Sequence, residues 1–232
     1  MRIGRGLPSE AVQNLHRFEP YGLNFIEETC AMSSTAAPYG FRPVGLLGGG
    51  DWSNSIRHIK IASGYGTAIF YGDVVKIVNT GTIQKDAGTT TMTPCGIFVG
   101  CRYTDPNTNQ PTYAQQWTAS VAASDAMAYV VDDPNVVFQA QGDASLAQTA
   151  LGNNVAVVQT AGSTSIGTSK NAIDSSTIAT TKTLPVRIIG FVDGPDIAVG
   201  DSYTDVICKF NSGGDATGDS CASHQYQDTT GI

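Results

Sequence analysis

The fold is decided by the stretch Ser124–Asn153, which reads SDAMAYVVDDPNVVFQAQGDASLAQTALGN. Ala126–Val131 is an apolar run rich in residues that favour strands, and it is broken by Asp132-Asp133-Pro134-Asn135, whose residue types favour a turn. Val136–Gln141 then alternates between apolar and polar positions, which is typical of a half-buried strand. Two strands around four turn residues predict a β-hairpin.

The end of the same stretch predicts a short helix over Ser145–Leu151. Asp143 or Ser145 could cap its first N–H groups, and Gly152 could take the left-handed conformation that follows a helix. We therefore expect at most one or two short helices in a protein built from strands.

A second hairpin is predicted where Ile97–Tyr103 and Tyr113–Ala119 flank the turn-rich loop Asp105–Pro111. Pro185–Val192 and Tyr203–Phe210 are further strong strand candidates, whereas residues 163–183, rich in Ser and Thr, read as weak strands or a long loop. Short strands about ten residues apart favour an all-β domain, a β-sandwich or a barrel-like core. We divide the chain into an extended N-terminal arm (1–37), a β-rich core (38–211) and a Gly/Ser linker with a C-terminal tail (212–232).

Composition narrows the function classes. The net charge is −7 and the 13 Lys and Arg residues are spread thinly, so the clustered cations that replace phosphate counterions on nucleic acid are missing. The longest apolar runs are about six residues, against the roughly 20 needed for a membrane helix. We expect no nucleic-acid partner and no membrane.

The cysteines are expected to be reduced. If Cys95–Cys101 is a regular strand, Cys95, Ile97, Val99 and Cys101 share one face, and six steps of about 3.3 Å hold the two sulfurs beyond disulfide reach. We interpret both as small core residues. The remaining cysteines, Cys30, Cys208 and Cys221, lack the spacing of zinc ligands.

No stretch carries a catalytic signature. The three histidines, His16, His58 and His224, are not accompanied by a G-x-S-x-G nucleophile motif. Turn chemistry accounts for Asp132, Asp133 and Asn135 better than a calcium site, whose loop spacing is absent. A glycosidase is disfavoured because all four Glu lie in residues 1–37. We expect no enzyme, no cofactor and no metal.

Three separated stretches together resemble one family. They are STAAPYGFRPVG (34–45), IASGYGTAIFYGDVVK (61–76) and LPVRIIGFVDGPDIAVGDSYTDVICKFN (184–211), followed by HQY (224–226). The ordered set is similar to head decoration, or capsid cement, proteins of tailed bacteriophages. Residues 1–31 have no counterpart in that pattern, and 212–223 look like an insertion.

The resemblance implies a structural virion protein that is made in the host bacterial cytoplasm. It would bind the outer capsid surface and stabilise contacts between subunits of the major capsid protein. It also implies a homo-oligomer, with a trimer at threefold positions as the expected form. The alternative is a tail- or fibre-associated adhesin that recognises host glycans with exposed aromatic and Asp or Asn side chains.

The expected partner contacts lie toward the ends of the chain. Aromatic residues there occur on segments with little regular pattern, so a neighbour would have to cover them. The candidate partner-contact residues are Phe18, Tyr21, Phe25, Tyr39, Phe41, Arg42, His224 and Tyr226.

Overall fold

The computed structural model describes residues 35–53, 55–195, 197–211 and 224–227. Strands and isolated bridges account for 42% of the described residues and helical segments for only 3% of them, which confirms the all-β prediction. The chain divides into Met1–Ala31 and a compact unit, Met32–Ile232, to which all described residues belong. None of the helical segments among these residues has the length and apolar composition of a membrane span.

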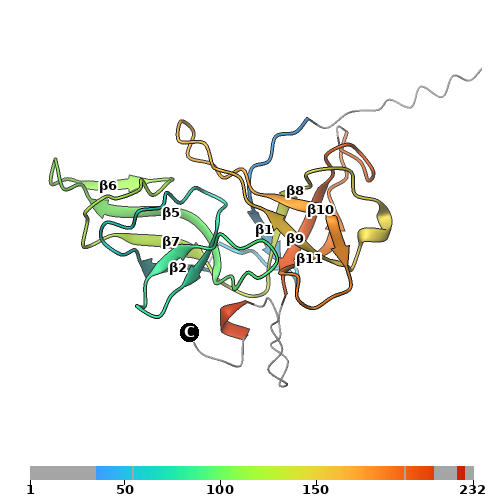
Figure 1. Ribbon diagram of the computed structural model, residues 1–232, viewed down its shortest axis with the longest axis horizontal. Helices are drawn as coiled ribbons and strands as arrows, with labels where there is room; N and C mark the ends of the chain where they lie inside the picture. The colour runs from blue at the N-terminus through green and yellow to red at the C-terminus, as the bar shows by residue number, and fades with distance from the viewer. Residues whose placement is uncertain (1–34, 54, 196, 212–223, 228–232) are drawn as a thin grey trace, which may run out of the picture. The chain divides into compact units, whose positions relative to one another are not determined.

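Two antiparallel sheets make up the compact unit, an arrangement consistent with a β-sandwich (Figure 1). Sheet A has the order β1-β8-β12-β11-β9-β10, and sheet B has the order β2-β7-β5-β3-β4 with β6 paired to β5. In chain order the strands are β1 (Arg42–Leu46), β2 (Ile56–Lys60), β3 (Val74–Ile77), β4 (Ile83–Lys85), β5 (Gly96–Thr104), β6 (Pro111–Ala114), β7 (Met127–Val131), β8 (Val136–Gln141), β9 (Asn154–Val158), β10 (Ala172–Ala179), β11 (Val186–Phe191) and β12 (Asp205–Phe210).

The predicted first hairpin is wrong in its pairing although both strands are present. β7 pairs with β2 and β5 in sheet B, and β8 pairs with β1 and β12 in sheet A, so the turn carries the chain from one sheet to the other. Asp133 builds this turn: its Oδ1 accepts the N–H of Asn135 at 2.8 Å, and its carbonyl accepts the N–H of Val136 at 3.1 Å. The same residue types serve a hairpin or a crossing between sheets, and the long-range partners of β7 and β8 decide between them.

The predicted helix is reduced to one 3-10 turn, Gln148–Ala150. The two predicted caps are used elsewhere, since Ser145 Oγ donates to the carbonyl of Gly200 and Asp143 Oδ1 accepts from Ser175. Gly152 does take the left-handed conformation, with φ of +83°. Tertiary contacts therefore override a weak helical tendency in this segment.

The pairing of the second hairpin is confirmed, because β5 and β6 pair antiparallel. The predicted bounds of its second strand are wrong: β6 begins at Pro111, inside the predicted loop, and ends at Ala114 rather than at Ala119. The strong strands near the C-terminus are confirmed as β11 and β12, which also pair. The Ser- and Thr-rich region contains one strand, β10, at the edge of sheet A.

Two apolar clusters hold the sheets. The larger contains side chains from sheet A together with Val74, Ile97 and Val131 from sheet B, so it joins the two sheets. The smaller lies within sheet B and its loops around the buried Trp117.

A β-bulge in β5 corrects the predicted cysteine face. The register shifts between Phe98 and Gly100, so Ile97 packs in the larger cluster whereas Cys101 packs in the smaller one. Cys95 and Cys101 are nevertheless both fully buried and unpaired, as predicted.

Candidate functional site

The extended segment before β1 is fastened to sheet A. Gln141 of β8 accepts the N–H of Ala37 at 2.9 Å and donates to the carbonyl of Thr35 at 3.2 Å. Tyr39 donates its hydroxyl hydrogen to Asp205 Oδ2 at 2.9 Å, and burial beside this carboxylate raises the pKa of Tyr39. Residues 35–39 therefore belong to the folded unit, which corrects the predicted boundary between arm and core at residue 37.

Phe41 is fully buried in the core. Its ring lies 6.4 Å from that of Phe138 and 5.8 Å from that of Phe210, centroid to centroid. It is not available to a partner in this structure. Arg42 is exposed, and its guanidinium lies 4.1 Å from the centroid of the Tyr39 ring, a cation–π contact on the same segment.

Gly40 makes a close approach possible beside Phe41. Its φ is +75°, and a Cβ there would lie 2.6 Å from both the carbonyl oxygen of Gly72 and the Cβ of Ser169. The N–H of Phe41 donates to the same Gly72 carbonyl at 3.0 Å. Only glycine satisfies both the conformation and the space at this position.

The C-terminal segment His224–Gln227 docks on sheet B. The side-chain amide of Gln225 pairs with the backbone of Ile77, since Oε1 accepts its N–H at 2.7 Å and Nε2 donates to its carbonyl at 2.8 Å. The N–H of Gln225 donates to the carbonyl of Pro94. A glutamine side chain thus supplies the hydrogen bonds that a neighbouring strand would otherwise make.

Tyr226 completes a polar cluster with residues of β2 and the β7–β8 turn. Its hydroxyl donates to Asp132 Oδ2 at 2.9 Å and lies 3.5 Å from the Cys95 sulfur. Arg57 Nε lies 3.0 Å from the same Asp132 oxygen, and the guanidinium lies 5.1 Å from the Tyr226 ring centroid. Burial raises the pKa of Asp132, and it raises the pKa of Cys95 to about 11, so the thiol is a poor nucleophile.

His224 is buried, with 1% of its surface exposed. Its Nδ1 accepts the N–H of Tyr226 at 3.3 Å. Burial lowers the pKa of His224 to about 4, so the ring is neutral at pH 7. The arrangement fixes the tail and offers no acid–base chemistry near neutral pH.

Three buried carboxylates of the compact unit are each neutralised by a cation from sheet B. The nitrogen–oxygen distances are 2.9 to 3.4 Å, and the pairs are Asp73–Lys85, Asp86–Lys76 and Asp132–Arg57. Asp73 also accepts from Ser169 Oγ at 2.6 Å and from the N–H of Phe70 at 2.9 Å. We interpret these pairs as structural, because hydrogen bonds and charges satisfy the carboxylates from within the fold.

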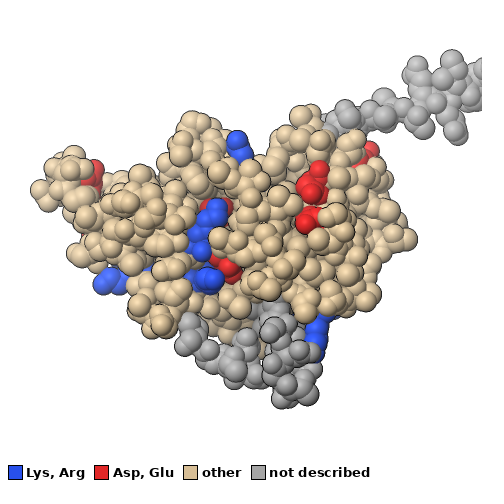
Figure 2. All heavy atoms as spheres, viewed as in Figure 1, with Lys and Arg blue, Asp and Glu red and all other residues tan. Residues whose placement is uncertain are grey.

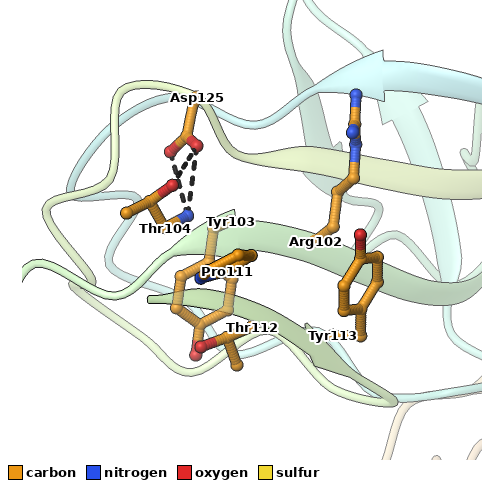
Figure 3. A pocket seen from close by; sticks show the side chains of 7 residues that line it. All are labelled: Arg102, Tyr103, Thr104, Pro111, Thr112, Tyr113 and Asp125. Carbon is orange, nitrogen blue, oxygen red and sulfur yellow. Dashed lines mark hydrogen bonds between the residues drawn. The ribbon is translucent and has the colours of Figure 1, made fainter. Parts of the chain in front are cut away.

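The outer face of the β5–β6 hairpin carries a pocket of about 220 Å³ (Figure 3). Arg102 on β5 lies directly opposite Tyr113 on β6, and Thr104 lies opposite Pro111. At the other end of the pocket, Asp125 accepts hydrogen bonds from the backbone N–H and the hydroxyl of Thr104 (Figure 3). Those bonds lower the pKa of Asp125, which keeps it ionised.

Sequence reasoning did not find this pocket. It predicted the hairpin that carries it, but it did not derive the register that places Arg102 opposite Tyr113. The predicted hairpin and its loop limits leave several registers open, and residue spacing alone does not choose among them.

The predicted partner-contact residues do not form one surface. Tyr39, Phe41 and Arg42 lie beside sheet A, whereas His224 and Tyr226 lie on sheet B. Phe18, Tyr21 and Phe25 lie outside the described residues. Within the described ranges, no cluster of three or more His, Cys, Asp or Glu side chains is arranged to hold a metal ion.

Comparisons with known proteins do not place this chain in a family. No family model matches the chain. No curated protein matches it, and no solved structure matches it.

Proposed function

We propose that this chain is a structural protein of a tailed-phage virion. It binds the outer surface of the capsid and stabilises contacts between subunits of the major capsid protein, without enzymatic turnover or a cofactor. The supporting observation is that the three stretches that resemble decoration proteins meet in space. Phe41 from the first bonds to Gly72 from the second and packs on Phe210 from the third.

This convergence supports the resemblance because the stretches are far apart in the sequence. Gly40 and Gly72 occur where the backbones approach closely, and Tyr39 bonds to Asp205. Residues that the resemblance singled out thus depend on one another for the same packing. A pattern without structural meaning would have no reason to pick out contacting residues.

The same packing suggests how the N-terminal segment would connect a capsid subunit to the β core. The chain is fastened to β8 at residues 35 and 37, and 34 residues precede that point, including Phe18, Tyr21 and Phe25. A segment held firmly at one end can tie a neighbouring subunit to the β core. A trimer of such chains would match the threefold positions of a capsid.

Capsid binding is tested by co-sedimentation of the full-length protein with capsids that lack it. The proposal expects saturable binding, and it expects deletion of residues 1–31 to weaken binding while the melting transition is kept. Tyr113→Ala, on the far hairpin, is the matched control and should bind like the natural chain. No sedimentation of the full-length protein at any capsid concentration would refute the proposal.

The tail or fibre adhesin requires the same kind of fold and differs in where the protein sits. Immunogold labelling of intact particles separates the two, since label over the head supports decoration and label confined to the tail supports the adhesin.

A further inference from the structure

The pocket on the β5–β6 hairpin contains an exposed cation. The side chain of Arg102 makes no hydrogen bond or close ion pair within the described part of the chain, and its charge acts on Asp125 in the same pocket, where it helps to lower the pKa of that carboxyl group. By contrast, Arg57, Lys76 and Lys85 pair with buried carboxylates. The surface visible in Figure 2 is largely uncharged, with Lys, Arg, Asp and Glu in few separate places. An exposed guanidinium whose hydrogen-bond donors are not used by the protein can bind an anionic group in two parallel hydrogen bonds.

The ring beside this cation is unusually accessible. Tyr113 is 71% exposed and lies directly opposite Arg102 across the strand pair. Figure 3 shows its hydroxyl end beside the base of the Arg102 side chain, whose guanidinium extends away from the ring. A large ring presented in this way offers an apolar face and a polar tip to a ligand.

The far end of the pocket accepts hydrogen bonds. Asp125 is ionised. Its Oδ1 accepts one hydrogen bond, from the N–H of Thr104, and has room for a second, whereas its Oδ2 already accepts from both the N–H and the hydroxyl of Thr104. It also repels anions, so a ligand with one acidic group would place that group at Arg102 and its hydroxyl groups at Asp125.

We propose that this pocket binds a carboxylate-bearing sugar, such as a uronic acid unit of an acidic polysaccharide. Arg102 takes the carboxylate, Tyr113 stacks on the C–H face of the ring, and Asp125 accepts from hydroxyl groups. A phosphate group alone would leave the ring of Tyr113 and the acceptor Asp125 unused. This binding goes beyond the proposed capsid function and does not depend on it.

The register of sheet B extends the site toward a second sugar. Arg102 and Lys60 both lie opposite Met127, on the two sides of β7, so they are separated by two strand spacings of about 4.8 Å each. Lys60 is exposed at the edge of the sheet. A linear acidic chain that crosses the strands would bring another carboxylate to Lys60.

The test is titration of the ¹⁵N-labelled full-length protein with trigalacturonic acid and with its methyl ester, followed by NMR. The proposal expects saturable shifts at Arg102 and Tyr113 with the acid, and at least tenfold weaker binding of the ester. Arg102→Gln and Tyr113→Ala should each weaken binding at least tenfold, whereas Lys170→Gln, which removes an exposed cation on another part of the chain, should not. Lys60→Gln should weaken binding of the trimer but not of galacturonic acid itself.

Several outcomes would overturn the proposal. They are an absence of shifts at millimolar sugar, equal binding of acid and ester, or unchanged affinity in Arg102→Gln with a native spectrum. Equal or tighter binding of a polyglutamate peptide would assign the pocket to an acidic protein segment instead. Since no capsid takes part, these outcomes are independent of the capsid-binding experiment.

Discussion

Replacement of Phe41 by alanine should destabilise the folded unit severely. The ring is completely buried and contacts the rings of Phe138 and Phe210. Truncation of a buried phenylalanine leaves a cavity and typically costs about 3–5 kcal/mol. With a urea dependence of about 2 to 3 kcal/mol per molar for a domain of this size, the unfolding midpoint should fall by more than about 1 M.

Urea unfolding followed by tryptophan fluorescence measures this effect, because Trp117 is buried in the smaller apolar cluster. Val44→Ala is the control: Val44 lies in the same strand, β1, but is 47% exposed, so its loss should cost less than about 1 kcal/mol. A loss below about 1 kcal/mol for Phe41→Ala would refute the reasoning. It would mean that the segment before β1 does not belong to the core.

Three further predictions concern buried groups. Burial lowers the pKa of His224 to about 4, so between pH 6.5 and pH 4 this residue binds a proton in the unfolded chain but not in the folded chain. The free energy of unfolding should therefore fall by about 2 kcal/mol when the pH is lowered from 7 to 5. Urea titrations at both pH values should show this difference, and an equal slope in His224→Gln would contradict it. Burial raises the pKa of Cys95 to about 11 and the pKa of Cys101 to about 12, so a thiol reagent should label these two residues only after the protein unfolds. The labelling is measured in a variant in which the two cysteines outside the described residues are replaced by serine. Rapid labelling of this variant in its native state would count against the prediction. Gly40→Ala should cost about 2 kcal/mol or more through its positive φ and the close Gly72 carbonyl, whereas Gly48→Ala, with open space around it, should change the melting temperature little; similar melts for the two variants would argue against the close approach.

Local pattern predicted the strands better than their partners. The alternation in Val136–Gln141 gave the bounds of β8 correctly, because a period of two depends only on neighbouring residues. The pairing of β7 with β2 and β5 depends on segments far away in the sequence, and the turn at Asp133 is compatible with either outcome. The bulge at Gly100 reversed the face of Cys101 for the same reason, since one extra residue shifts every later position.

For the candidate site as well, the sequence indicated individual residues but not the residues that contact them in the fold. Composition indicated that aromatic residues near the chain ends need cover, and for Phe41 that cover comes from the core itself. The tail was expected to need a partner, but Gln225 fastens it to Ile77 within the chain. The Arg102–Tyr113 pocket depends on strand register, which residue spacing alone does not specify.

The most direct test of the proposed function is a cryo-EM map of the phage particle that carries this protein. The proposal predicts density for the two-sheet unit on the outer surface of the head, repeated at positions where major capsid subunits meet, with threefold symmetry. Density for this unit confined to the tail or fibres, or its absence from the head, would contradict the proposal.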